Sequence, residues 1–476
     1  MIKIPECASA ERVFAFFKEI SEIPHASGNT APIADYLVNF AKARGLTVIR
    51  DAADNVIIKK PATAGYESRP GVIFQGHTDM VPAVSEDTDF CFDTDALRLC
   101  VDGDWLSADG TTLGADDGIA VAYALAVLDS DDIAHPAFEA VFTSNEEIGL
   151  LGAAALDGKN IDGRLLINID SDAEGIFTVG CAGGMRCDIT DTLATEVTDG
   201  YVYSLTLSGL RGGHSGVEID KGRTNAIKAL FDILASLGDV RIASLDCGNA
   251  DNAIPRNASV TFISEKRIND ELEQLLSEAK NALISAGECD VETIWASVQE
   301  NGYKALTLSD SAKIISLVRA LPSGVLYMSE DVQGLVETSQ NLGIARLVDG
   351  ELTLTLSVRS AKSAKKRAAA DLIAKIAEEH SSRYGEHGEY PAWEYKRDSY
   401  LRDAMCRVYE QMYNKSPEVV IIHAGLECGL LTDKIEGLDC VSIGPDARDI
   451  HTPEERLSVS SAVRVWEYLL TLLKSI

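Results

Sequence analysis

Apolar positions in the first 187 residues follow two patterns, one with helical spacing and one of short continuous runs. Near the N-terminus Val13, Phe14 and Phe17 recur at helical spacing, which predicts an amphipathic helix and not a signal peptide. The predicted helices span 9–23, 30–44 and 119–128, and the predicted strands span 46–50, 56–59, 71–74, 137–143 and 165–169.

Three of these strands end in histidine or acidic residues. A further acidic pair, Asp116 and Asp117, lies at the N-terminus of the helix predicted over 119–128. In open α/β sheets ligands bind beyond the carboxyl ends of the strands, so one crevice is expected to receive all of these side chains. They are His77 and Asp79 after the first strand, Glu146 and Glu147 after the second, and Asp170 after the third.

The pattern changes near residue 188 to longer alternating strands and amphipathic helices. A strand at 258–263 followed by a helix at 270–284 recurs as a strand at 352–358 and a helix at 363–380, which suggests an internal duplication. The polar stretch 381–388 is interpreted as a hinge.

After the hinge the first pattern returns, with helices at 401–412 and 460–473 and strands at 419–422 and 440–443. The predicted fold class is therefore α/β. A catalytic domain with a mostly parallel sheet flanked by helices is split by an inserted α+β lid domain. The predicted domains are 1–187 and 397–476, which form the catalytic domain, and 188–396, the lid.

Composition restricts the partners and the compartment. The 476 residues are 46% hydrophobic and 25% charged, as in soluble globular proteins, and no apolar run is long enough to cross a membrane. A net charge of −31 repels nucleic acid and anionic membranes, so both are excluded as partners. The ten cysteines include no Cys-x-x-Cys pair, which favours reduced thiols in the cytoplasm.

The residue types at the strand ends favour a catalytic metal site. Imidazole and carboxylate are ligands for zinc, cobalt or manganese, and the absence of cysteine argues against structural zinc. Two divalent cations balance the charge of three carboxylates and a bridging hydroxide, which favours a pair of metal ions that share one carboxylate. The candidate ligands are His77, Asp116, Glu147, Asp170 and His451.

Each of these residues also has an ordinary interpretation when it is taken singly. Asp116 is typical of a helix cap, Asp170 of a turn, and the pair Glu146 and Glu147 of a solvated surface. Their joint occurrence at strand ends favours the metal site. Because neighbouring residues past a strand point in different directions, one residue of the pair can bind metal while the other faces the water as general base.

Five motifs resemble those of the PepD-like branch of the di-zinc aminoacylase and carboxypeptidase G clan, the aminoacyl-histidine or cytosol non-specific dipeptidases. The motifs are Phe74–Val81, Leu113–Gly118, Asn145–Gly149, Asn168–Asp170 and His423–Gly429. The resemblance implies one metal ion on His77, Asp116 and Asp170, and a second on Asp116, Glu147 and His451. It also implies that Asp79 orients His77 and that Glu146 is the base.

The resemblance extends to substrate contacts. His214 matches a family histidine that helps to hold the oxyanion, and the implied assembly is a homodimer. Asn252 and Arg359 match positions that contact substrate, and Arg359 is expected to pair with a substrate carboxylate. Glu427 is expected to meet the substrate amino terminus, which would limit substrates to dipeptides.

The predicted function is hydrolysis of dipeptides, including β-alanyl-histidine, by water that Glu146 deprotonates. Alternatives with the same site are an N-acyl-amino-acid deacylase, a carboxypeptidase and a tripeptidase. An alternative of another class is a non-catalytic protein that binds metal or peptide, for which Asp79 and Glu146 have no evident use.

Overall fold

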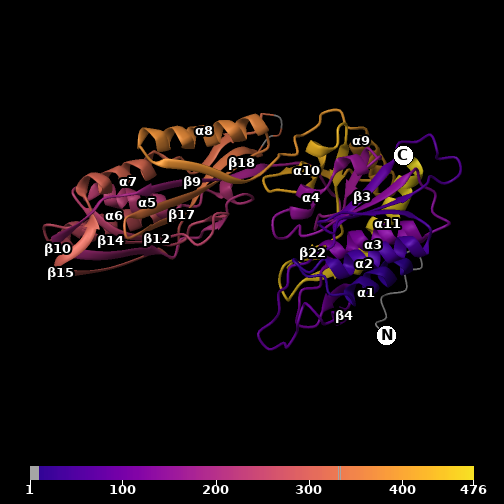
Figure 1. Cartoon of the computed structure of the whole chain (residues 1–476), viewed down its shortest axis with the longest axis horizontal. Coiled ribbons are helices and arrows are strands. Elements are labelled where there is room, and N and C mark those ends of the chain that lie inside the picture. Colours follow the sequence, from indigo (N-terminus) through magenta and orange to yellow (C-terminus); the bar gives the residue numbers. More distant parts are fainter. Residues whose placement is uncertain (1–9, 331, 333) are drawn as a thin grey trace. The chain divides into compact units, whose positions relative to one another are not determined.

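The computed structural model describes residues 10–330, 332 and 334–476, which divide into two compact units. The first unit holds the residues up to Cys181 with Tyr395–Ile421 and Leu426–Ile476, and the second holds Ala182–Glu394 and Ile422–Gly425. In Figure 1 the indigo and yellow ends of the chain come together in the first unit, because most of the second unit lies between them in sequence. Residue 9, where the first helix was predicted to begin, lies outside the described residues.

A twisted sheet with parallel strands at its centre forms the core of the first unit. Its spatial order is β1 (Thr47–Arg50), β2 (Val56–Lys60), β6 (Phe138–Thr143), β3 (Val72–His77), β7 (Leu165–Asn168), β21 (Asp439–Ser442), β8 (Ile176–Cys181) and β20 (Glu418–Ile422). The strands from β6 to β21 are parallel, whereas β1–β2, β2–β6 and β21–β8 are antiparallel. The predicted parallel character is thus confined to the central strands.

Burial accounts for the parallel centre. Every residue of β3, β6, β7 and β21 is buried, as in strands that helices cover on both faces. Helix α3, apolar on all sides beyond its first turn, packs between β3 and α1. The helices of this unit are α1 (Glu11–Ser21), α2 (Ala31–Ala43), α3 (Ala115–Asp129), α4 (Leu151–Ala155), α9 (Tyr400–Tyr413), α10 (Glu427–Lys434) and α11 (Val459–Ser475).

Strands β3 and β6 end at the same level, and β7 ends two residues earlier, opposite Gln75. His77 of β3 pairs with Thr143 of β6, and Gln75 pairs with Asn168 of β7. A smaller antiparallel sheet brings in the last candidate ligand, because His451 lies in the connection between two of its strands. Its order is β22 (Ala447–Arg448), β23 (Arg456–Ser458), β5 (Trp105–Ala108) and β4 (Leu99–Asp102).

The second unit contains a larger antiparallel sheet. Its main path is β15 (Glu292–Leu306), β10 (Thr195–Ser208), β14 (Ala258–Ser264), β12 (Arg241–Cys247), β17 (Val336–Val348), β18 (Glu351–Ser360), β9 (Gly183–Thr192) and β19 (Arg383–Tyr390), with β16 (Gly324–Met328) paired to β17. Its helices are α5 (Ala226–Ser236), α6 (Asn269–Ser285), α7 (Leu308–Ala320) and α8 (Ser363–Glu379). Figure 1 shows α8 lying along β18 and β9. A separate ribbon pairs β11 (Gly213–His214) with β13 (Ala253–Ile254).

The large sheet consists of two copies of one strand-helix motif. The first copy is β10-α5-β12-β14-α6-β15. In the sequence it lies between β9 and α7 of the second copy, which is β9-α7-β17-β18-α8-β19. In each copy the fourth strand lies beside the first, the first beside the third and the third beside the second. The copies meet at an antiparallel pair centred on Asp246 and Arg346. The predicted repeat corresponds to β14–α6 and β18–α8, which occupy equivalent positions, so the internal duplication is confirmed.

The predicted hinge at 381–388 was wrong. Residues Arg383–Tyr390 form β19, which pairs with β9. As an edge strand it has a neighbour on one side only, and most of its residues are exposed, so its composition is that of a polar loop. The predicted α/β fold with an inserted α+β unit is confirmed. Within the described part of the chain, no helix has the length and apolar character needed to cross a membrane.

Hydrogen exchange distinguishes the edge strand from a hinge. We expect alternate backbone amides of Arg383–His387 to exchange slowly, because those N–H groups bond to β9. The loop at 86–94, which contains no strand, serves as the fast-exchanging control. Uniformly fast exchange in both segments, measured by mass spectrometry or NMR, would contradict the strand assignment.

Candidate metal centre

Asp116 lies between two histidines that come from opposite ends of the chain. Its Oδ1 atom is 3.0 Å from His77 Nε2, and its Oδ2 atom is 3.2 Å from His451 Nε2. Glu147 Oε1 lies 2.8 Å from the same nitrogen of His451, and Asp170 Oδ1 lies 3.9 Å from His77 Nε2. The five predicted metal-binding residues therefore meet in one place in the first unit.

Among the residues that the structure describes, three groups of side chains could hold a metal ion. In each group the potential ligand atoms lie within 4.8 Å of one another. The groups are His77, Asp116 and Asp170; Asp116, Glu147 and His451; and His77, Glu146 and Glu147. The first two share Asp116, and each of its oxygens faces one of them.

A backbone carbonyl sets the tautomer of His77. The imidazole Nδ1 lies 2.9 Å from the carbonyl oxygen of Asp79, and a carbonyl only accepts hydrogen bonds, so Nδ1 carries a proton. In the neutral ring the lone pair is then on Nε2, which faces Asp116 and is available to a metal ion.

Burial and like charges control the protonation of the acidic groups. Burial raises the pKa of Glu146 to about 8, and neighbouring carboxylates add to the shift. Burial and the charge of Asp116 raise the pKa of Asp170. Burial also acts to raise the pKa of Asp116, but contacts with His451 and His77 outweigh it and lower that pKa. The carboxylates of Asp116 and Glu147 in turn raise the pKa of His451 to about 10.

These properties fit a divalent cation. The carboxylates repel one another in a buried pocket, and a positive charge among them reduces that cost. Glu147 Oε1 is buried and lies 2.8 Å from His451 Nε2, so both atoms are close enough to bind the same ion. The nitrogen and oxygen donors are those that zinc, cobalt and manganese accept.

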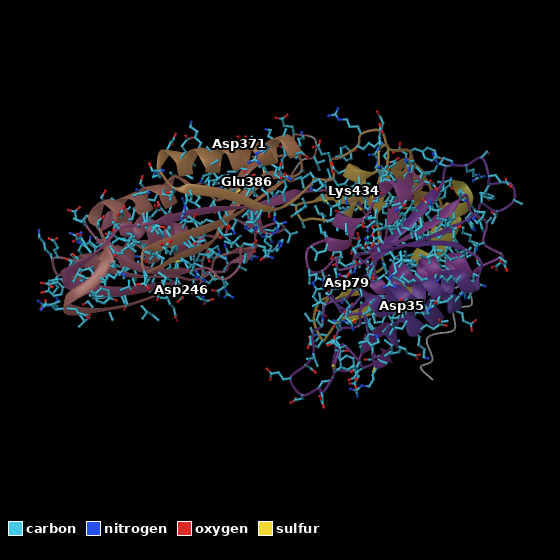
Figure 2. The ribbon with its side chains drawn as sticks, in the orientation of Figure 1. Asp35, Asp79, Asp246, Asp371, Glu386 and Lys434 are labelled. Atoms are coloured by element: carbon cyan, nitrogen blue, oxygen red, sulfur yellow. The ribbon has the colours of Figure 1, made fainter. Side chains whose placement is uncertain are left out.

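Asp79, labelled in Figure 2, connects the ends of two strands. Its Oδ1 accepts the backbone N–H of Glu146 at 2.9 Å, and its Oδ2 accepts the hydroxyl of Ser27 at 2.8 Å. The carboxylate is 3.7 Å from His77 Nδ1, farther than the carbonyl of the same residue. Asp79 therefore holds the loop that carries Glu146 as well as the ring of His77.

Sequence reasoning missed three residues around the site. Ser27 holds Asp79, and Asp117 Oδ2 accepts the backbone N–H of His77 at 3.2 Å. The third is Glu455, which binds the backbone that precedes Asp116. The doublet at 116 and 117 was a signal for Asp117, whereas neither Ser27 nor Glu455 belongs to a recognisable motif.

Glu427, the first residue of α10, is fully buried beneath the site. Its Oε2 accepts hydrogen bonds from Gln75 Nε2 and Thr143 Oγ1, both at 2.6 Å, and Oε1 has no partner among the described residues. Burial raises its pKa. The expected contact of Glu427 with a substrate amino group stays a prediction.

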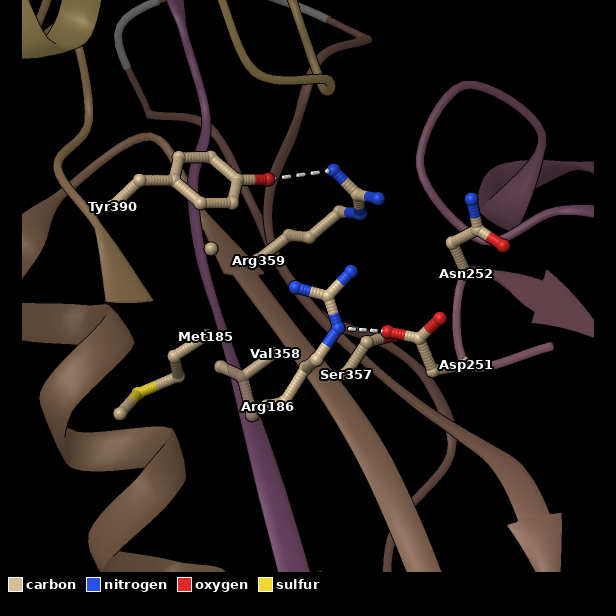
Figure 3. A pocket seen from close by; sticks show the side chains of 9 residues that line it. Met185, Arg186, Asp251, Asn252, Ser357, Val358, Arg359 and Tyr390 are labelled. Atoms are coloured by element: carbon tan, nitrogen blue, oxygen red, sulfur yellow. Dashed lines mark hydrogen bonds and ion pairs between the residues drawn. The ribbon is translucent and has the colours of Figure 1, made fainter. Parts of the chain in front are cut away.

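The other predicted substrate residues belong to the second unit. His214 Nδ1 accepts the N–H groups of Gly216 and Val217, at 3.1 and 3.2 Å, which leaves the ring proton on Nε2. Burial and the nearby charge of Arg359 lower the pKa of His214, so this ring is neutral. Asn252 and Arg359 line one pocket, shown in Figure 3, where Arg359 donates a hydrogen bond to the hydroxyl of Tyr390 at 2.9 Å.

A family model described as "Peptidase family M20/M25/M40" matches residues 73–475. The chain belongs to this family. It is accordingly a hydrolase that acts on peptide bonds, and the resemblance noted from the motifs is confirmed.

Known relatives resemble this peptidase along nearly its whole length. It is 37% identical over 478 residues to the cytosol non-specific dipeptidase of Escherichia coli strain K12, covering 98% of each chain. The crystal structure of the aminoacylhistidine dipeptidase from Vibrio alginolyticus matches with a TM-score of 0.89 and 35% identity, over 99% of this chain and 98% of that one. A tripeptidase from Staphylococcus aureus matches with a TM-score of 0.56 at 17% identity, over 98% and 97% of the chains, and shares the fold.

A substitution at Gly76 tests how closely β3 packs against α3 in this peptidase. An added Cβ would lie 2.4 Å from both Ala120 Cβ and Asp117 Oδ2, so Gly76→Ala forces the strand away from the helix. We expect a loss of about 1–3 kcal/mol of stability, measured by denaturant unfolding. Gly385→Ala is the control, since its Cβ would meet no heavy atom within 4 Å. Equal stability of the two variants would show that β3 tolerates displacement.

Proposed function

We propose that the chain is a dipeptidase with two divalent metal ions in the first unit, zinc by preference and cobalt or manganese as substitutes. The position of Asp116 is the observation that carries the proposal, because each of its oxygens faces a different histidine. His77, Asp116 and Asp170 hold one ion, and Asp116, Glu147 and His451 hold the other. The absence of cysteine and the buried acidic donors suit catalytic zinc.

Dipeptides are the proposed substrates, with β-alanyl-histidine and other Xaa-His peptides among them. Two similarities support this choice: the identity to an enzyme named cytosol non-specific dipeptidase, and the structural match to an aminoacylhistidine dipeptidase. The name of the Escherichia coli relative, a cytosol enzyme, supports a cytoplasmic location, and the described cysteines are all free, as in a reducing compartment. A homodimer is proposed from the family resemblance.

In the proposed mechanism Glu146 transfers the proton that hydrolysis requires. A pair of divalent ions supplies water of lowered pKa and polarises the scissile carbonyl. Glu146 takes one proton from the attacking water, the water oxygen bonds to the carbonyl carbon, and the carbon–nitrogen bond then breaks. Glu146 returns the proton to the leaving amine. Asp79 fixes the backbone of Glu146, so the base keeps its position through both transfers.

The second unit carries groups suited to bind substrate. His214 is neutral with its proton on Nε2, which makes it a donor for the oxyanion that forms on the carbonyl oxygen. Arg359 and Asn252 are proposed to bind the free carboxylate of the substrate, since they line one pocket and a guanidinium forms paired hydrogen bonds with carboxylate. Glu427 is proposed to meet the substrate amino group through its unpartnered oxygen.

A substrate panel with metal analysis tests the proposed function. We expect two equivalents of metal, hydrolysis of β-alanyl-histidine and other dipeptides, and weak activity on dipeptide amides, which lack the carboxylate for Arg359. Removal of metal with a chelator should abolish activity, and zinc should restore it. Faster cleavage of an N-acetyl amino acid or a tripeptide would replace the dipeptidase proposal with deacylase or tripeptidase activity. Full activity without metal would overturn the mechanism.

Glu146→Gln tests the general base. The amide has nearly the same shape but accepts no proton, so we expect turnover to fall about 100- to 10,000-fold while metal content stays at the wild-type value. Inductively coupled plasma mass spectrometry and steady-state kinetics provide the two measurements. Near-normal turnover would rule out Glu146 as the base, and loss of one metal ion would identify it as a ligand instead.

A further inference from the structure

Glu455, which is not among the proposed metal ligands, accepts hydrogen bonds from the backbone of the loop that ends at Asp116. Glu455 Oε2 accepts the backbone N–H groups of Leu113 and Gly114 at 2.9 and 3.0 Å, and Oε1 accepts those of Ala115 and Asp116 at 2.8 and 3.3 Å. Glu455 is only 2% exposed. One buried acid thus binds four consecutive backbone donors.

These donors lie in a segment before the continuous part of helix α3. The φ/ψ values of Asp116 and Asp117 are non-helical, so no helical carbonyl satisfies the N–H groups of Leu113–Asp116. A carboxylate from elsewhere in the chain does so, and the four hydrogen bonds offset the cost of burying its charge.

The position of Glu455 in the sequence links it to the second ligand-bearing segment. It lies four residues after His451, in the connection between β22 and β23. The same short loop therefore presents the His451 imidazole to Asp116 Oδ2 and holds the backbone of Asp116 through Glu455. Asp116 and His451, which are far apart along the chain, are in this way both positioned by the same loop.

We propose that Glu455 is a positioning residue that determines how tightly the ion on Asp116, Glu147 and His451 is bound. This inference rests on the proposed two-metal centre. Without the four hydrogen bonds to Glu455, the loop at 113–116 and the loop of His451 move independently. The ion then loses ligands that are held in position before it binds. Groups that orient metal ligands typically affect metal affinity about 10- to 100-fold.

The test compares Glu455→Gln with two matched controls. Glutamine keeps one acceptor oxygen but turns an NH2 group toward two backbone donors, so two of the four hydrogen bonds are lost. Glu139→Gln changes another buried carboxylate that accepts backbone N–H groups, those of Asp162 and Gly163, on a segment without proposed ligands. Glu454→Gln changes the exposed neighbour of Glu455.

We expect Glu455→Gln to weaken binding of the second Zn²⁺ about 10- to 100-fold in competition with a chromophoric chelator. The visible absorption of the Co²⁺-loaded protein should also change, since it reports ligand geometry. At limiting zinc kcat should fall with KM unchanged, and excess zinc should restore part of it. Glu139→Gln should lose stability without any of these changes, and Glu454→Gln should match the wild type.

Wild-type affinity and an unaltered Co²⁺ spectrum in Glu455→Gln, with only a loss of stability like that of Glu139→Gln, would overturn the inference. Glu455 would then only stabilise the segment 113–116. If Glu455→Gln does not fold, Glu455→Asp keeps the charge but shortens its reach and undergoes the same measurements. Fewer than two bound ions in the wild type would instead overturn the metal centre itself, and the positioning role with it.

Discussion

The structure depends on a concentration of negative charge that the fold buries in one place. Asp116 lies between His77 and His451, with Asp170 and Glu147 beside them, and burial makes each ionised carboxylate costly. Histidines and cations are the groups that can reduce this cost. A pocket of this kind is stable only if the chain holds its acids at fixed separations, so the surrounding segments have to be rigid.

Hydrogen bonds to backbone groups provide that rigidity and leave the candidate ligand atoms free. The Asp79 carboxylate holds the N–H of Glu146, and its carbonyl orients the His77 ring. Asp117 accepts the N–H of His77, and Glu455 binds the N–H groups that lead to Asp116. The backbone at His77, at Glu146 and at Asp116 is thus held in each case by an acid from another segment of the chain.

The second unit is built from a duplicated strand-helix motif, and its proposed substrate residues differ in chemical type from the ligands of the first unit. Its two motif copies meet through β12 and β17, so the helices of both copies share one core. The proposed substrate residues of this unit include a neutral imidazole, His214, and a guanidinium, Arg359, whereas the proposed metal ligands of the first unit include three carboxylates. The free carboxylate of a peptide and the oxyanion that forms on its carbonyl are both acceptors for such donors.

The sequence by itself determined the buried strands that precede the site, the ligand types at their ends and the family, and it hinted at the internal repeat. The spacing of apolar residues indicates which positions are buried, and short motifs indicate which chemical groups lie together. Only the tertiary structure shows which strands are neighbours and which residues distant in the sequence are in contact. The stretch from 383 to 390 is a strand only because β9 lies beside it, and its exposed edge makes it resemble a loop. Glu455 matters because its partners lie about 340 residues earlier, a proximity that folding alone creates.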